Sequence, residues 1–186
     1  MKLNDTIVAQ STPQGKGAIG IIRLSGKDSI KIVNSLFPSK DLSNVKSHTI
    51  HYGNIQYEKS IIDEVLISVF KKPNSYTREN IIEISCHGSD FIIKKILSIT
   101  VKLGARVADK GEFTFRSFIN GNIDLSQAEA VSDLISSNSD NSHKIAINHI
   151  KGIFSNKIKK LRKELINLSS LLELELDFSE EDVEFA

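Results

Sequence analysis

The sequence lacks the features that mark several protein classes, although its 186 residues suffice for one domain or two small ones. Its single cysteine, Cys86, excludes an intrachain disulfide framework and a metal site built from several thiolates. No apolar run approaches the ~18–20 residues of a membrane span, and the start, MKLNDTIVAQ, does not resemble a secretory signal. Lys and Arg number 24 against 23 Asp and Glu, which is too even for a strongly basic nucleic-acid binder. We therefore expect a cytoplasmic globular protein with no membrane partner.

Short β-branched runs separated by turn residues fill the sequence up to about residue 118. The predicted strands are 6–10, 18–25, 48–57, 61–70, 81–86 and 105–108. The predicted helices of this half are 27–36, 90–102 and 113–120. Strands and helices mix without a regular βαβ repeat, so the pattern predicts an α+β fold with a mixed sheet rather than a doubly wound one.

Residues 122–186 contain no proline and one glycine, Gly152, and their apolar residues recur at helical spacing. A capping box at Ser126–Glu129 predicts a helix over 127–136, and a long helix is expected over 142–176. We place the domain boundary near Gly121, which gives a mixed domain at 1–120 and the first part of an all-α domain at 121–186. The apolar stripe of the long helix has too few partners here, so we expect another chain or a missing part of the protein to cover it.

Charge is uneven along the long helix. Residues 151–164 carry six Lys and Arg with one Glu, whereas residues 165–186 carry seven Asp and Glu with no Lys or Arg. A solvated helix face followed by an acidic end explains this pattern most simply. A basic face for RNA phosphates and charge pairing between chains are the two alternatives.

Two glycine patterns resemble nucleotide motifs without meeting their requirements. Gly15–Gly20 matches G-x-G-x-x-G, but a strand pattern follows it where a dinucleotide site needs a helix N-terminus. We interpret these glycines as sites of close backbone approach between strands. Gly26-Lys27-Asp28 lacks the earlier glycine and the hydroxyl residue of a P-loop, so we expect this chain alone not to hydrolyse nucleotide.

Charged residues on two apolar strands are the candidate binding residues. Arg23 lies within AIGIIRLS, where an unpaired guanidinium is costly to bury, so we expect either a salt bridge at a sheet edge or a ligand contact. Glu83 shares a strand face with Ser85 and His87, which indicates either a solvated face or the wall of a pocket. A carboxylate there can accept two hydrogen bonds from an amidine-like edge such as that of a pterin.

Cys86 and His87 are adjacent, yet neighbours on a strand point to opposite faces, so they are badly placed as a nucleophile and its base. We assign Cys86 to the core. The five histidines show no metal-ligand spacing. We therefore predict neither a catalytic residue nor a metal ligand in this chain.

Four segments carry a resemblance to a known family, in that family's order. They are DTIVAQSTPQGKGAIGIIRLSG (5–26), PNSYTRENIIEISCHG (73–88), GARVADKGEFTFRSFINGNIDLSQAEAVSDLI (104–135) and LELELDFSEEDV (172–183). On these motifs the chain resembles the N-terminal part of the MnmE (TrmE) family of bacterial tRNA-modification GTPases. The resemblance implies a tetrahydrofolate-binding-type domain that also forms a homodimer, then a helical domain interrupted by a GTPase domain.

The resemblance also implies a function for the whole protein. With MnmG, a partner that carries FAD, the family modifies the wobble uridine of certain tRNAs at C5, and a 5-formyl-tetrahydrofolate-type donor supplies the one-carbon unit. GTP, potassium and magnesium act in the GTPase domain, which we expect to be absent from this chain.

The resemblance assigns folate contacts to Arg23 in IGIIRLSG and to Glu83 in IIEISCHG. The third position departs from the family pattern, because NGNIDL has Asn122 where the family has lysine. A neutral amide can hydrogen-bond the ligand but cannot pair with its carboxylates. Two other functions therefore stay open, namely an assembly scaffold that does not bind folate and a direct tRNA-binding module.

Overall fold

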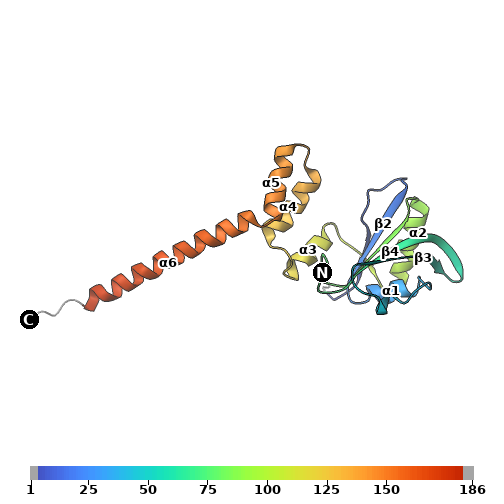
Figure 1. Cartoon of the computed structure of the whole chain (residues 1–186), viewed down its shortest axis with the longest axis horizontal. Coiled ribbons are helices and arrows are strands. Elements are labelled where there is room, and N and C mark those ends of the chain that lie inside the picture. Colours follow the sequence, from blue (N-terminus) through green and yellow to red (C-terminus); the bar gives the residue numbers. More distant parts are fainter. Residues whose placement is uncertain (1–3, 182–186) are drawn as a thin grey trace, which may run out of the picture. The chain divides into compact units, whose positions relative to one another are not determined.

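The computed structural model describes residues 4–181 of the chain. The chain divides into two compact units, and the boundary in the sequence falls between Asn122 and Ile123. Unit 1 contains an α+β fold, and unit 2 is all-helical (Figure 1). The α+β class predicted from the mixture of strand and helix patterns is confirmed.

A mixed six-stranded sheet forms the frame of unit 1, and its strands follow the predicted runs closely. The strands are β1 (Ile7–Gln10), β2 (Ile19–Ser25), β3 (Thr49–Tyr57), β4 (Ser60–Phe70), β5 (Ile81–His87) and β6 (Arg106–Val107). Their order is β3-β4-β5-β2-β1-β6, and every pair is antiparallel except the parallel pair β1–β6. The central position therefore falls to β2 and β5, the two strands that carry the candidate residues.

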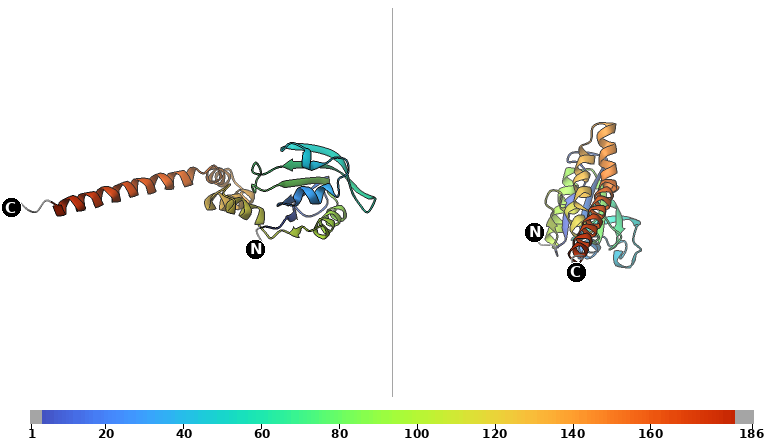
Figure 2. Two further views of the ribbon diagram at one scale, coloured as in Figure 1. Left: turned by 90° about the horizontal axis from the view of Figure 1, so that it is seen from below. Right: turned by 90° about the vertical axis from the view of Figure 1, so that its left-hand side faces the viewer.

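The helices of unit 1 are α1 (Ser29–Asn34), α2 (Asp90–Lys102) and α3 (Glu112–Ile119), with a 3-10 turn, η1, at Leu42–Asn44. Figure 2 shows α1 and α2 on the same side of the sheet. The alternation of the strands explains this side, because isoleucines and leucines at every second position point toward these helices. The buried core includes Ile22 and Leu24 of β2, Ile82 and Ile84 of β5, Ile67 of β4, and Ile93 and Ile96 of α2.

The other face of the sheet is not covered in the same way. Apolar side chains on this face are exposed, namely Ile19, Ile50, Tyr52 and Leu66. The side chains of Arg23 and Glu83 project from this second face, because both positions alternate with core residues. We call this second face of the sheet the open face.

The expected close approach at the glycines near the start of the chain is found at Gly17, against Gly88, and at Gly20, whereas a Cβ on Gly15 would meet nothing within 4 Å. The Gly17 backbone N–H donates to the Gly88 carbonyl at 2.9 Å, and a Cβ on Gly88 would lie 2.4 Å from the Gly17 carbonyl oxygen. A Cβ on Gly20 would lie 2.6 Å from Ile93 of α2. The strand β2 follows this loop directly, so the chain presents no helix N-terminus to a pyrophosphate there.

Unit 2 consists of α4 (Leu125–Ser136), α5 (Asp140–Ile150) and α6 (Ile153–Glu181). The predicted capping box at Ser126–Glu129 is wrong by two residues. Asp124 is the N-cap, its side chain accepts from the Gln127 backbone N–H, and the Gln127 side chain accepts from the Asp124 N–H. Both tetrads fit the same pattern, and Asp124 prevails because it stands before the first helical turn.

The single long helix expected over 142–176 is also wrong. The chain has two helices there, and the break is at Lys151 and Gly152. Gly152 has φ +72°, a left-handed conformation that ends α5 in the manner of a C-terminal glycine. The Gln127 side-chain amide donates to the Ile150 carbonyl at 2.7 Å and so stabilises the end of α5 from α4.

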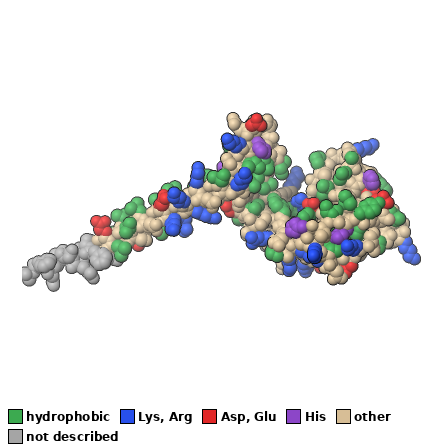
Figure 3. Space-filling view, in the orientation of Figure 1, with side chains coloured by type: hydrophobic (Ala, Val, Ile, Leu, Met, Phe, Trp, Pro, Cys, Tyr) green, Lys and Arg blue, Asp and Glu red, His purple; other side chains and the backbone are tan. Residues whose placement is uncertain are grey.

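The described side chains of helix α6 lie largely in solvent. From Asn156 to Leu176 every residue is exposed, and Leu165 retains 58% of its accessible surface. Figure 3 shows hydrophobic side chains and Lys and Arg side chains along this helix. The acidic end of the sequence beyond residue 181 lies outside the described residues. None of the described helices is long and apolar enough to cross a membrane.

Candidate functional site

The two candidate residues on the strands are direct partners. The register of β2 and β5 places Arg23 opposite Glu83. The Arg23 Nε donates to Glu83 Oε1 at 2.8 Å, and Arg23 Nη2 lies 2.7 Å from the same oxygen. The prediction of a salt bridge is confirmed, but it lies between two central strands and not at a sheet edge. The pair is partly buried, with side-chain exposures of 28% and 22%, so Glu83 does not stand on a solvated face.

Aromatic rings flank the Arg23 guanidinium. Its central carbon lies 5.5 Å from the ring centre of Phe113 and 5.9 Å from that of Tyr76. Phe113 comes from α3, and Tyr76 comes from the loop between β4 and β5. A guanidinium held against aromatic rings keeps its charge and loses mobility, and such a planar group also favours stacking of a flat ligand.

The ion pair leaves part of Glu83 available. Both contacts from Arg23 end on Oε1, and no described residue donates to Oε2. The Arg23 fork also has further N–H groups, because a guanidinium carries five donors. The site therefore presents a carboxylate acceptor and cationic donors side by side, which suits a planar heterocycle that has both donors and acceptors along one edge.

Asn122 is linked to Arg23 through Tyr76. Its side-chain amide donates to the Tyr76 carbonyl at 2.9 Å and to Ser117 Oγ at 3.2 Å. An amide has two hydrogens, so both are engaged, and the free polar atom of Asn122 is its carbonyl oxygen. The Tyr76 hydroxyl in turn bonds the hydroxyl of Thr114 at 2.9 Å. Asn122 thus holds the loop that places Tyr76 over Arg23.

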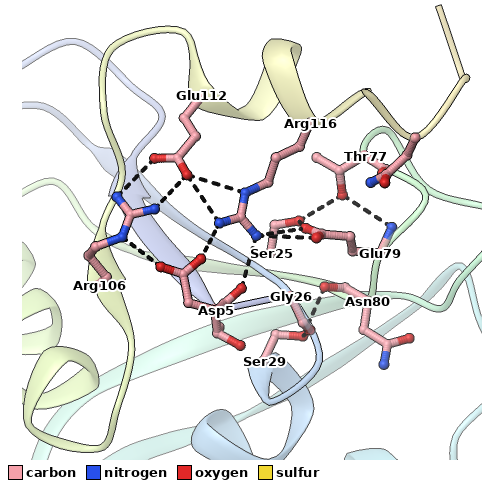
Figure 4. Close-up of polar contacts among 12 residues, drawn as sticks. Asp5, Ser25, Gly26, Ser29, Thr77, Glu79, Asn80, Arg106, Glu112 and Arg116 are labelled. Atoms are coloured by element: carbon pink, nitrogen blue, oxygen red, sulfur yellow. Dashed lines mark hydrogen bonds and ion pairs between the residues drawn. The ribbon is translucent and has the colours of Figure 1, made fainter. Parts of the chain in front are cut away.

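An ionic network that the sequence analysis missed supports the same loop (Figure 4). Its centre joins three carboxylates and two guanidiniums, namely Asp5, Glu79, Glu112, Arg106 and Arg116, and the exposed Asp109 adds a fourth carboxylate 3.8 Å from Arg106. The Arg116 side chain is 1% exposed and bonds all three carboxylates. Arg106 lies 2.6 Å from Glu112 and 2.7 Å from Asp5. The only sequence signal was Arg116 itself, a charge between phenylalanines in EFTFRSFI.

The guanidiniums of this network keep Asp5 and Glu112 ionised. Burial acts to raise the pKa of Glu112, but the hydrogen bonds from Arg106, the Asp109 N–H and Arg116 outweigh it and hold the pKa below its ordinary value. The pKa of Asp5 also lies below its ordinary value, because bonds from Arg106 and Arg116 overcome its desolvation. The network is therefore charged at neutral pH and fixes α3 and the loop around Glu79.

A second polar pair lies at the other end of β5. The Asp63 carboxylate accepts from the His87 backbone N–H at 2.8 Å and lies 2.7 Å from His87 Nδ1. Of the three side chains that the alternation placed together, Ser85 and His87 line a hollow of about 320 Å³ beside Tyr52 and Leu66, and Glu83 does not. Cys86 is 3% exposed within the core, as predicted, and burial raises the pKa of its thiol to about 11. The described residues contain no group of three or more metal-ligating side chains.

Comparison with protein families gives two matches that together span most of the chain. Residues 6–122 match the family described as GTP-binding protein TrmE N-terminus, and residues 125–186 match the MnmE helical domain. The boundary between the two matches coincides with the division between the two units.

Individual relatives give the same result. A protein of Cytophaga hutchinsonii named tRNA modification GTPase MnmE is 58% identical over 182 residues, which cover 98% of this chain and 40% of the relative. Proteins of the same name from Flavobacterium johnsoniae and Streptococcus thermophilus are 58% and 48% identical, over 98% and 96% of this chain and 40% and 39% of their own lengths. The chain thus spans about 40% of the length of the curated relatives that it matches.

Proposed function

The chain belongs to the MnmE (TrmE) family of tRNA-modification GTPases, and from this premise we propose that unit 1 binds a reduced folate and forms a homodimer. The folate would serve as the one-carbon donor for modification of the wobble uridine at C5, together with MnmG, in the cytoplasm. GTP hydrolysis, with potassium and magnesium, would belong to a domain outside this chain.

The Arg23–Glu83 pair supports folate binding most directly. The unengaged Oε2 of Glu83 would accept N–H groups from the 2-amino and ring-nitrogen edge of the pterin. The remaining N–H groups of Arg23 would donate to oxygen or nitrogen acceptors of the same ring, and Tyr76 and Phe113 offer apolar contact. The folate supplies the one-carbon unit, and these residues bind it and orient it.

The structure of Asn122 refines its expected role. Its two amide hydrogens are already donated within unit 1, so the side chain has no spare donor for a folate carboxylate. We propose that Asn122 acts as a positioning residue, because it holds the carbonyl of Tyr76 and thereby the ring beside Arg23. Replacement by lysine would then restore a cation at the cost of this anchor.

Calorimetric titration with 5-formyltetrahydrofolate tests the folate site. We expect wild-type chain to bind and Glu83→Gln to bind about 10- to 100-fold more weakly, because hydrogen bonds to a charged group contribute about 1.5–3 kcal/mol. Glu129→Gln is the matched control, since Glu129 is an exposed carboxylate on α4, outside unit 1. Absence of binding to well-folded wild-type dimer would refute the folate proposal for this chain.

The open face supports the proposed homodimer. Ile50, Tyr52 and Leu66 are 65%, 68% and 46% exposed on adjacent strands, and contiguous exposed apolar surface of this kind marks interaction sites. Sedimentation equilibrium should show a dimer at micromolar concentration, and Tyr52→Asp with Leu66→Asp should shift it to monomer. A wild-type monomer would contradict the proposal, and a dimer that fails to bind folate would favour the assembly scaffold.

Contact with tRNA through α6 is the second candidate function. Lys159, Arg162 and Lys163 are exposed and share one side of the helix through their i, i+3 and i+4 spacing. The first half of α6 holds one ion pair among the described residues, Lys160 with Glu164 at 3.9 Å. Affinity for tRNA should fall steeply with salt, and Arg162→Glu with Lys163→Glu should abolish this dependence while Lys94→Glu on α2 leaves it unchanged.

A further inference from the structure

A polar hollow in unit 1 lies apart from the candidate folate residues. It has a volume of about 230 Å³ and is lined by Asn4, Asp5, Lys27, Lys72, Arg78, Glu79, Asn80 and Asn120. None of Arg23, Glu83 and Asn122 lines it. The wall combines three cations, two carboxylates and three amides. Whether it favours an anionic or a cationic ligand therefore depends on which of these charges are already paired.

Both carboxylates of the wall are already paired inside the ionic network. Asp5 accepts from Arg106 and Arg116, one on each oxygen. Glu79 accepts from Arg116 on both oxygens, at 3.2 and 3.3 Å, and from Ser25 Oγ at 2.6 Å. Figure 4 shows these contacts directed away from the side chain of Asn80 and into the network. Their negative charge is therefore largely neutralised before any ligand arrives.

The three cations of the wall are not paired in this way. Among the described residues, neither Lys27, Lys72 nor Arg78 makes an ion pair. The one side-chain bond of Arg78 runs from Nη1 to the Asn120 carbonyl at 3.4 Å, which leaves most of its five donors unused. With Asp109, which lies 3.8 Å from Arg106, the network of four carboxylates and two guanidiniums sums to −2, so with the three further cations this region carries about +1.

The backbone around the hollow is held in place. The Asn80 carbonyl accepts from the Gly26 N–H at 3.0 Å and from Ser29 Oγ at 2.9 Å, which ties the loop to the end of β2. The Asn80 side-chain oxygen accepts from the Lys72 backbone N–H at 3.1 Å. Lys27, Lys72 and Arg78 therefore start from fixed backbone positions, which reduces the entropy lost when they converge on a ligand.

We propose that this hollow binds a phosphate group. A single carboxylate offers two oxygens, whereas a phosphate offers three or more acceptor oxygens and up to two negative charges, which matches three separate cations. The side-chain NH2 of Asn80 is a further donor, since the bond from Lys72 uses only its oxygen. The proposal is independent of folate binding, because the two sites share no residue.

Titration of isotope-labelled 186-residue chain with inorganic phosphate, at constant ionic strength against sodium chloride, tests the site by NMR. We expect the backbone amides of Lys27, Lys72 and Arg78 and the side-chain amide of Asn80 to shift with saturation. Lys27→Gln and Lys72→Gln should each weaken binding about fivefold, the effect of a favourable exposed ion pair, and the double variant about 25-fold. Lys94→Gln on α2 removes the same charge outside the hollow and should leave binding unchanged.

Lys27 and Lys72 are both exposed, so the two variants should keep the NMR spectrum of a folded protein. Any loss of phosphate binding should then come from the lost charge and not from unfolding. A decauridylate probe then distinguishes the source of the phosphate. Competition with inorganic phosphate for the same amides would identify an RNA backbone, and failure to compete would identify a small phosphorylated ligand. Absence of saturable shifts in wild type, or equal affinity of wild type and the double variant, would overturn the proposal.

Discussion

Unit 1 and helix α6 both contain apolar residues in regular patterns, but these side chains are buried in unit 1 and exposed in α6. In β2 and β5 the alternation places Ile22, Leu24 and Ile84 in a core with no solvent exposure. In α6 the three- and four-residue spacing places Leu161 and Leu168 in solvent, with 54% and 53% exposure. A periodic pattern therefore shows which face of an element can be buried, whereas burial itself depends on what packs against that face.

The ion pairs of the two regions also differ in burial. Arg116 is buried and bonds three carboxylates, whereas the Lys160–Glu164 pair of α6 is 80% and 61% exposed at 3.9 Å. Removal of one partner from a buried pair costs about 3–5 kcal/mol, while exposed pairs contribute about 0–1 kcal/mol. The stability of unit 1 should therefore depend on its ion pairs, and that of α6 should not.

The largest effect should come from Arg116→Met, which keeps most of the volume but removes one of the two guanidiniums that pair with buried Glu112 and the guanidinium that pairs with Glu79. We expect unit 1 to lose about 3–5 kcal/mol of unfolding free energy. Tyrosine fluorescence during urea unfolding measures this selectively, because the chain has no tryptophan and Tyr52, Tyr57 and Tyr76 all lie in unit 1. Lys160→Met is the control from α6, and an equal loss in both variants would refute the contrast.

A paired truncation compares the two apolar patterns directly. Ile84→Ala should destabilise unit 1 by about 2–4 kcal/mol, because it opens a cavity in the core. Leu168→Ala should change the stability of the chain by less than about 0.5 kcal/mol, since that side chain is exposed in α6. Urea midpoints from circular dichroism and tyrosine fluorescence give both values. A large loss from Leu168→Ala would show that α6 is covered in solution, for example by a second chain.

Acid should weaken unit 1 through its network. The folded pKa values of Asp5 and Glu112 lie below their ordinary values, so their contribution is complete above the unfolded pKa near 4 and is lost as the pH falls below it. The unfolding free energy of unit 1 should therefore be flat near neutrality and fall below about pH 4. Glu112→Gln should reduce this pH dependence, and an unchanged slope in urea titrations would contradict the assignment.

The smallest effect should come from the break between α5 and α6. Gly152→Ala places a side chain at φ +72°, where a Cβ meets only ordinary contact with Gln127, so the cost is backbone strain of about 1 kcal/mol. Circular dichroism should show slightly reduced thermal stability of the helices. Increased helicity without destabilisation would instead show that α5 and α6 join readily.

The strands and their facing residues were predictable, because alternation in AIGIIRLS and IIEISCH is unambiguous. Arg23 and Glu83 were each recognised as polar groups on apolar strands, but their pairing depends on β2 lying beside β5 in one register, across 60 positions of sequence. Sequence spacing carries no information on such long-range register. The roles of Arg23, Glu83 and Asn122 toward a folate stay predictions.

The ionic network was not predictable for the same reason. Its members come from four separate places: the start of the chain, the loop that precedes β5, strand β6, and helix α3. No local motif joins these places. The helix break at Gly152 had a local sequence signal, since a lone glycine in a helical pattern is a recognised helix terminator. The apolar spacing continues across Gly152, however, and this spacing alone does not show that the residue has a left-handed conformation.

The bond between Asp5 and Arg116 spans 111 positions, so it joins the first strand region of unit 1 to its last helix. This ion pair therefore connects the two sequence ends of unit 1. A force applied to the beginning of the chain would be transmitted to α3 through this ion pair before it could separate β1 from β2. Forced unfolding of unit 1 should consequently begin when the Asp5–Arg116 ion pair breaks, and both ends of the unit should unfold together.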